Sequence, residues 1–310
     1  MGQELYGAWL AFRKGKHPSR DIDAFEYALE TNLRRLAHDI ETREYRHGNY
    51  KRVTIQEKKR RDLAVAAVRD RVIHRLIYDK LVTIFDPTFD PDVWSCRIGK
   101  GLHRCLNRTI ELLTRYPNSY IWRMDATKFF DSVDHAKLRE FLRRRVRDKQ
   151  TLWLCDEIIR SYHVGDLHGI PLGNLTSQVF ANIYLNEFDR YVRHVLKPQA
   201  YARYGDDAIL FARTRHEARD LRSEATVFLK GALKLTISPK SDVIIRADQP
   251  LHWLGHVVTD KCAVVDKYTT RSVLRKVNLR NVASYKSLNL AKWPKRELDW
   301  RLLDEVFDIY

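Results

Sequence analysis

The sequence lacks any apolar run of the roughly 20 residues that a helix needs to cross a bilayer. Its first five residues, MGQEL, lack the basic and apolar regions of a signal peptide, and Gly2 lacks the rest of a myristoylation pattern. No internal repeat or low-complexity linker is found. We therefore expect a cytoplasmic protein without a membrane partner.

Cysteine is also scarce, because the chain of 310 residues contains only Cys96, Cys105, Cys155 and Cys262. No two of them are close in sequence, which argues against a zinc knuckle or a redox dithiol. Scattered cysteines of this kind are typical of reduced thiols in the core of a cytosolic protein. A chain of this length can form two or three lobes around sizeable apolar cores.

Local patterns predict further elements along the chain. A helix near 66–83 has Val72, Ile77 and Leu81 on its inward face. The other predicted elements are helices at about 102–115, 135–147 and 175–196, a helix that begins at the capping box 214–217, and strands near 234–245 and 252–258.

Acidic residues are outnumbered by basic ones, 40 to 56, so the formal net charge is +16. This excess favours a polyanionic partner, since phosphate contacts supply affinity that does not depend on sequence. Charge alone leaves two alternatives open, an anionic membrane surface and a basic protein that binds no nucleic acid.

The most informative acidic residues lie in the tetrapeptide 204–207, YGDD. β-prone residues precede and follow it, and Gly205 allows the dihedral angles of a two-residue hairpin. The adjacent carboxylates of Asp206 and Asp207 repel each other, and a divalent cation would remove that conflict. For these four residues alone, a solvated Asp-rich turn is the alternative.

A third carboxylate favours the metal hypothesis. Residues 120–124, YIWRM, predict a buried strand, and Asp125 follows directly. If this strand and the hairpin are neighbours in one sheet, Asp125 and the hairpin carboxylates can share metal ions. Two magnesium ions held this way activate an attacking hydroxyl and stabilise a leaving pyrophosphate. The pattern therefore indicates nucleotidyl transfer, where catalysis depends on positioning and charge neutralisation.

Several segments occur in the order of the motifs of reverse transcriptases. The segments that resemble the five palm motifs are 125–135 (DATKFFDSVDH), 169–178 (GIPLGNLTSQ), 204–207 (YGDD), 235–240 (LTISPK) and 252–255 (HWLG), the last being the primer grip. The segments that resemble the fingers motifs are 59–63 (KRRDL) and 69–72 (RDRV). The resemblance covers roughly residues 50 to 265.

The resemblance implies an RNA-directed DNA polymerase that makes cDNA from a template RNA with two Mg²⁺ ions, or Mn²⁺ in their place. It implies an α+β right-hand fold whose palm is an antiparallel sheet backed by helices. We expect a helical N-terminal extension (1–50), fingers (51–119), a palm (120–260, with a fingers insertion near 140–175) and a short helical thumb (261–310). The implied partners are template RNA, the cDNA primer strand and dNTPs.

The resemblance also assigns roles around the metals. Asp125 and Asp206 would bind both ions, Asp207 would support them, and the backbone carbonyl of Ala126 would join. Lys240 would protonate or steady the pyrophosphate leaving group. Surface acidity without a metal is the alternative for the three carboxylates.

Basic fingers residues and the primer grip complete the expected contacts. Lys59 and Arg61 would clamp the triphosphate, unless their basic run is merely solvated. Trp253, Leu254 and Gly255 would hold the primer end. A core tryptophan in a strand is an equally good interpretation of Trp253.

Phe130 and the loop 169–178 would face the incoming nucleotide. The ring of Phe130 would leave no room for a 2′-hydroxyl and so select dNTPs, unless it is a core residue beside Phe129. With glycine at position 205, the tetrapeptide 204–207 also resembles that of viral RNA-dependent RNA polymerases. Phe130 argues against that alternative.

Leu172 and Gly173 give the subtype. With Gln178 after Ser177, they resemble the reverse transcriptases of diversity-generating retroelements, which are group II intron-like bacterial enzymes. Those enzymes misincorporate mainly opposite adenine and work with a small, basic, oligomeric accessory protein. An aliphatic side chain at 172 would remove polar contacts near the nascent base pair and lower fidelity.

Three alternatives to this subtype remain. One is a group II intron reverse transcriptase, for which we expect a longer thumb and often a nuclease module. Another is a phage-defence reverse transcriptase, which shares the palm. The non-enzymatic alternative is an RNA-binding protein on a decayed polymerase fold.

Overall fold

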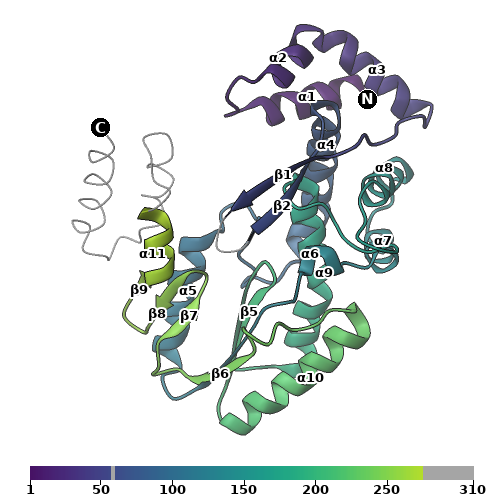
Figure 1. Cartoon of the computed structure of the whole chain (residues 1–310). Helices are drawn as coiled ribbons and strands as arrows, with labels where there is room; N and C mark the ends of the chain where they lie inside the picture. Colours follow the sequence, from purple (N-terminus) through teal and green to yellow (C-terminus); the bar gives the residue numbers. More distant parts are fainter. Residues whose placement is uncertain (57–59, 275–310) are drawn as a thin grey trace, which may run out of the picture. The chain divides into compact units, whose positions relative to one another are not determined.

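The computed structural model describes residues 1–56 and 60–274 and shows a mixture of helices and antiparallel sheets (Figure 1). The chain divides into two compact units. The first comprises Met1–Asp90, Thr127–Arg190 and Phe228–Thr236, and the second comprises Pro91–Ala126, Tyr191–Val227 and the chain from Ile237 on. The expected α+β class is confirmed.

The first unit begins with three helices, as the sequence predicts. They are α1 (Gly2–Arg13), α2 (Arg20–Tyr27) and α3 (Leu29–Glu41). Leu5 and Trp9 of α1 and Leu36 of α3 are fully buried at helical spacing. The apolar faces of α1 and α2 contact α4 (Val68–Phe85), whose buried Val72, Ile77 and Leu81 lie on the predicted inward face.

The rest of the first unit is one hairpin and further helices. Strands β1 (Lys51–Gln56) and β2 (Arg60–Val65) pair antiparallel, and the one-turn 3₁₀ helix η1 (Asp86–Thr88) follows α4. The helices are α6 (Phe129–Ser132), α7 (His135–Arg143), α8 (Lys149–Arg160) and α9 (Leu175–Tyr191). Helix α7 is shorter than the predicted 135–147, because Asp148 caps α8 and the chain must turn before it.

The second unit is built on a four-stranded antiparallel sheet in the order β4-β5-β3-β6. Its strands are β3 (Tyr120–Met124), β4 (Ala200–Tyr204), β5 (Asp207–Ala212) and β6 (Val243–Arg246). Strand β3 is central and pairs with β5 on one side and β6 on the other. The predicted strand at 120–124 and the predicted hairpin are therefore neighbours in one sheet.

The two faces of this sheet pack against different elements. Ile121, Ile209 and Phe211 face a cluster that includes helix α5 (Leu102–Arg115) and Trp253. Ala212 faces the opposite side, against Ala218 of helix α10 (Arg215–Leu233). Helix α10 begins with the predicted capping box: Glu217 N donates to Thr214 Oγ1 (3.1 Å), and Arg213 N donates to the Glu217 carboxylate (2.8 Å).

Three details differ from the sequence prediction. Residues 252–258 are not one strand but the hairpin of β7 (Leu251–Trp253) and β8 (His256–Val258), which forms a separate sheet with β9 (Ala263–Val265). Of the predicted strand at 234–245, only β6 forms, and one isolated bridge at Ile237 precedes it. The predicted helix at 175–196 is an α-helix only up to Tyr191 (α9), and a single π-helical turn, η2 (Val192–Leu196), follows.

The cysteines only partly follow expectation. All four are free, and Cys105 and Cys155 are buried, but Cys96 is exposed and Cys262 is half-buried. Helix α11 (Lys267–Leu274) is the last described element, so most of the expected thumb lies outside the described residues. Among the described helices, none is both long and apolar enough to cross a membrane.

Candidate active site

The tip of the β4–β5 hairpin is a two-residue turn at Gly205 and Asp206. Tyr204 pairs with Asp207 across it, and Gly205 has φ +65°, a conformation that glycine adopts without strain. The turn is held from outside the hairpin, because Gly205 N donates to Ser95 Oγ (2.8 Å). The buried Arg203 donates to the Gly205 carbonyl (2.7 Å). No local sequence pattern indicates that Ser95 and Arg203 support this turn.

Asp125 lies directly after β3, beside the hairpin tip. Met124 is opposite Ala208 in the register of β3 and β5, so the next residue along β3 comes level with the start of β5. The backbone at this point is fixed, since Ser238 N donates to the Asp125 carbonyl (2.8 Å) and Ala126 forms a bridge with Ile237. Ala126 is buried.

The carboxylates of Asp125 and Asp206 are in contact. Burial, the charge of Asp125 and a hydrogen bond between the two side chains together raise the pKa of Asp206 well above its usual range. A negative charge on Asp206 beside Asp125 is therefore unfavourable without a compensating positive charge. Oxygen ligands held in a pair are what magnesium prefers, so this donor set fits a divalent cation.

Asp207 is held differently. Arg123 donates from Nε to Oδ1 (3.2 Å) and from Nη2 to Oδ2 (3.0 Å), and its Nη1 donates to the His252 carbonyl. Burial raises the pKa of Asp207 to about 6, although the Arg123 guanidinium lowers it. The Trp253 indole N–H also favours the charged carboxylate, although it forms no hydrogen bond of normal geometry.

Within residues 1–56 and 60–274, no group of three or more His, Cys, Asp or Glu side chains is arranged to hold a metal ion. The structure thus brings Asp125 and Asp206 together. Asp207 is ion-paired with Arg123, and the charge of Asp125 contributes to its raised pKa. The metal assignments remain predictions.

Lys240 and the turn after β7 lie on the same unit as these carboxylates. Lys240 is exposed and comes two residues after Ser238, which binds the Asp125 backbone. Trp253 is 1% exposed and belongs to the core, so the structure favours the core interpretation of its side chain. Leu254 and Gly255 form the β7–β8 turn, both with positive φ (+51° and +75°).

The loop 172–174 is fixed to strand β2 within the first unit. Ala64 N donates to the Leu172 carbonyl (2.9 Å), and Asn174 Nδ2 donates to the Ala64 carbonyl (2.6 Å). Gly173 has φ +105°, and a Cβ there would lie 3.5 Å from Leu63. Arg61 lies on the same strand, three residues before Ala64, whereas Lys59 lies outside the described residues. Sequence reasoning missed Asn174 as the residue that fixes the loop.

Phe130 is half-buried at the start of α6. Its neighbour Phe129 is in the core, and the two rings meet edge to face at 5.5 Å. Ile170 N donates to the Phe130 carbonyl (2.8 Å), which ties α6 to the loop that leads to Leu172. Phe130 is therefore not the core residue of the pair.

The fold and the sequence of this chain are similar to those of known proteins. The structure is similar to that of telomerase from Candida albicans in complex with a TWJ fragment of telomeric RNA, with a TM-score of 0.54 and 12% identity over 92% of this chain and 57% of that one. This likeness shows a polymerase fold. Residues 50–258, well over half of the chain, match the model of the family described as reverse transcriptase (RNA-dependent DNA polymerase). The chain belongs to this family and is thereby classed as an RNA-directed DNA polymerase, a transferase.

The chain is also similar to curated proteins. Protein YkfC of Escherichia coli (strain K12) is 26% identical over 280 residues, which cover 77% of this chain and 73% of YkfC. Group II intron-encoded protein LtrA of Lactococcus lactis subsp. cremoris is 20% identical over 269 residues, which cover 64% of this chain and 44% of LtrA. The chain thus spans less than half the length of LtrA.

Proposed function

We propose that this protein extends a DNA primer on an RNA template, and that Asp125 and Asp206 hold the catalytic metal ions. The contact between these two carboxylates carries the proposal. Folding alone does not favour two half-buried acidic groups that repel each other, whereas a cation site requires them. Two magnesium ions, when bound, supply the charge that activates the primer 3′-hydroxyl and stabilises the leaving pyrophosphate.

The chain's own residues position the reactants. The β3–β5 register and the Ser238 contact fix Asp125, while Ser95 and Arg203 fix the turn that carries Asp206. Arg123 holds Asp207 in the charged form beside them. Positioning of this kind accounts for most of the catalysis in phosphoryl and nucleotidyl transfer. Lys240, exposed beside the Asp125 anchor, is proposed to donate a proton to pyrophosphate, and the Ala126 carbonyl to join the metal ligands.

The nucleotide is proposed to meet Phe130, Leu172 and Gly173, with Lys59 and Arg61 on its triphosphate. The hydrogen bonds of Ala64 to the loop 172–174 support this grouping, because they bring the β1–β2 hairpin and the loop together. The turn at Leu254 and Gly255 is proposed to contact the primer through its backbone, since the Trp253 ring is in the core. The right-hand organisation, with fingers at 51–119, palm at 120–260 and thumb at 261–310, is part of the same proposal.

The finer proposal is an error-prone enzyme of a diversity-generating retroelement, with a small basic accessory protein. Leu172 carries it, because an aliphatic side chain there offers no hydrogen bond to a base pair. A group II intron-type enzyme is the second candidate, favoured by the similarity to LtrA.

The direct experiment offers the purified protein an RNA template with an annealed DNA primer, Mg²⁺, and either dNTPs or rNTPs. The proposal expects extension with dNTPs only. Extension with rNTPs at an equal rate would indicate an RNA polymerase, and binding without extension would indicate an RNA-binding protein.

A further inference from the structure

Helix α4 contains a buried histidine, His74, that has no part in the proposed chemistry. Its side chain belongs to a residue that is 1% exposed, and burial together with the neighbouring His47 lowers the pKa of His74 to about 3. The ring of His74 is therefore neutral near pH 7. A neutral imidazole has one N–H donor and one acceptor nitrogen, and a buried ring needs a partner for each.

Both ring nitrogens of His74 have such a partner. Nε2 lies 3.0 Å from Nε2 of His47, and Nδ1 lies 2.5 Å from Oγ1 of Thr176. The other ring nitrogen of His47, Nδ1, lies 2.7 Å from the carbonyl oxygen of Gly48, which can only accept. Nδ1 of His47 therefore carries the hydrogen, and with both rings neutral its Nε2 accepts from His74. This leaves Nδ1 of His74 as the acceptor for the Thr176 hydroxyl.

Thr176 lies in the first turn of α9 and is fully buried. The loop directly before this turn contains Leu172 and Gly173, which are proposed to contact the incoming nucleotide. The next residue of the turn, Ser177, donates from Oγ to the carbonyl of Pro171 (2.6 Å), so the turn is bound to the start of the same loop. A shift of the first turn of α9 would therefore move the loop as well.

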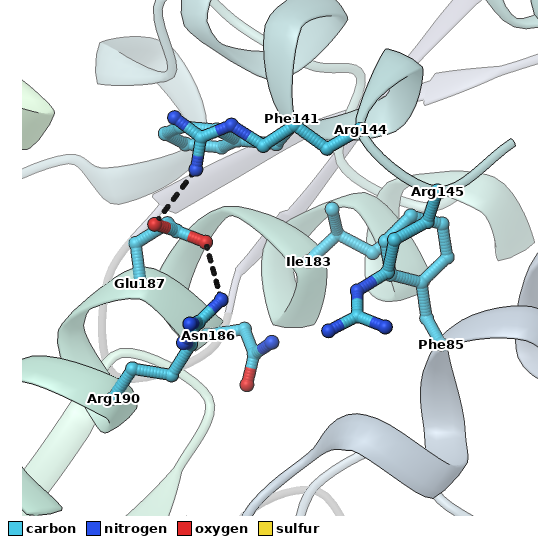
Figure 2. A pocket seen from close by; sticks show the side chains of 8 residues that line it. All are labelled: Phe85, Phe141, Arg144, Arg145, Ile183, Asn186, Glu187 and Arg190. Atoms are coloured by element: carbon cyan, nitrogen blue, oxygen red, sulfur yellow. Dashed lines mark hydrogen bonds and ion pairs between the residues drawn. The ribbon is translucent and has the colours of Figure 1, made fainter.

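Farther along the two helices, α4 and α9 both line a pocket of about 170 Å³ (Figure 2). Phe85 lines it from the end of α4, and Ile183 lines it from α9. At this level α9 is bound to the end of α7 instead, because Glu187 is ion-paired with Arg144 (2.9 Å), which directly follows α7. The hydrogen bond to His74 connects α9 with α4 at the other end, where α9 begins.

We infer that His74 is a positioning residue: by accepting from Thr176, it fixes the first turn of α9 to α4 and so holds the loop 172–174 against the incoming nucleotide. The inference rests on the proposed function, because it assigns a further residue to the same nucleotide site. The loop is proposed to contact the nucleotide and not the metal ions. Loss of the hydrogen bond should therefore weaken dNTP binding and leave the maximal rate of extension nearly unchanged.

The test measures single-turnover primer extension by the full chain on an RNA template, over a series of dATP concentrations with uracil as the next template base. Thr176→Val replaces the hydroxyl by a methyl group of similar size, so that Nδ1 of His74 has no donor. It should raise the half-saturating dATP concentration about fivefold to tenfold and change the maximal rate by less than about twofold. Thr176→Ser keeps the hydroxyl and should restore most of the affinity.

Thr109→Val is the matched control. Thr109 is also fully buried on a helix, but its Oγ1 donates to the Cys105 carbonyl (2.9 Å) within the same helix, α5. The control therefore loses a buried hydroxyl without losing a contact between two elements, and it should keep the wild-type half-saturating concentration. Thermal unfolding of each protein is measured as well, because a purely structural hydrogen bond would lower the unfolding midpoint and leave dATP affinity unchanged.

His74→Phe tests the same hydrogen bond from its other end, since it keeps a ring and removes the acceptor. It should raise the half-saturating dATP concentration as Thr176→Val does. The double variant should bind dATP no more weakly than either single variant, because both substitutions remove one contact. Additive effects would show that the two residues act separately and would overturn the inference.

Three further results would contradict the positioning role. They are wild-type dATP affinity in Thr176→Val, an equal loss of affinity in Thr176→Ser or Thr109→Val, and failure of Thr176→Val to fold, since the hydrogen bond would then support the core and not the loop. A wild type that does not extend the primer defeats the proposed polymerase and this inference with it. Extension by the wild type, with unchanged dATP affinity in Thr176→Val, defeats the positioning role alone.

Discussion

Arg123 donates two hydrogen bonds, of 3.2 and 3.0 Å, to the carboxylate of Asp207 across the β3–β5 pair. Arg123 lies directly opposite Ile209, so Asp207 is its diagonal neighbour on the same face of the sheet. The same guanidinium donates to the carbonyl of His252, the middle residue of β7. One side chain thus connects the β4–β5 hairpin with the strand that leads to the Leu254–Gly255 turn.

Arg123→Gln should slow primer extension about tenfold, because Asp207 then loses the charge that keeps it ionised and the β7 carbonyl loses its donor. Single-turnover extension rates would measure this. Arg123→Lys retains the charge but not the paired geometry, so it should restore part of the rate. An Arg123→Gln enzyme with the wild-type rate would show that the ion pair serves stability only.

Phe130→Val should admit ribonucleotides, because the shorter side chain leaves space for a 2′-hydroxyl. We expect the ratio of kcat/KM for dNTP over rNTP to fall at least about tenfold, within the range that steric discrimination provides. Phe130→Tyr keeps the bulk of the ring and should keep the discrimination. Unchanged ratios in the valine variant would remove Phe130 from the nucleotide site.

Leu172→Gln should reduce misincorporation opposite template adenine, since the amide restores polar contacts near the nascent base pair. Sequencing of cDNA from a defined template would measure the error spectrum. Leu172→Met, which stays apolar, should leave that spectrum unchanged. If all three proteins make the same errors, the diversity-generating subtype loses its physical basis.

His74 should make the protein sensitive to acid. Burial and the neighbouring His47, whose Nε2 lies 3.0 Å from that of His74, lower the pKa of His74 to about 3. In the unfolded chain this histidine binds a proton as the pH falls below about 6.5, whereas in the folded protein it does so only at a much lower pH. The contribution of His74 to stability is therefore lost as the pH falls below about 6.5. This amounts to about 2 kcal/mol at pH 5.

Urea unfolding at pH 7.5 and pH 5 would check the His74 prediction. His74→Gln should lose much of the difference between the two pH values, whereas His17→Gln, at an exposed site, should keep it. Asp206 and Asp207, whose pKa values are raised, change the stability of the wild type in the opposite sense over the same pH range. The decisive comparison is therefore between variants, and a His74→Gln protein with the same pH dependence as the wild type would contradict the assignment.

Local patterns predicted much of the fold. The apolar spacing of residues 102–115 and the buried run 120–124 match α5 and β3, because periodicity and β-propensity act within a single element. The hairpin at Gly205 followed from turn chemistry. The β7–β8 turn was missed because Leu254 has φ +51°, a conformation that its sequence does not suggest.

The candidate site was predictable only where one element carries the information. Asp125 and Asp206 could be paired from a strand end and a turn. The two hydrogen bonds from Arg123 to Asp207 depend on the register between strands, and the hydrogen bond from Asn174 to the Ala64 carbonyl joins residues 110 positions apart. Neither relationship can be predicted from a local sequence pattern.

The contact between Asp125 and Asp206 is proposed to serve catalysis and not stability. The most direct test compares primer extension and thermal unfolding for Asp206→Asn, with Asp248→Asn at an exposed site as the control. Asp206→Asn should lower the extension rate at least about 1,000-fold while its unfolding midpoint stays the same or rises, because the repulsion with Asp125 is gone. Full activity, or a loss of activity that accompanies unfolding, would contradict the account.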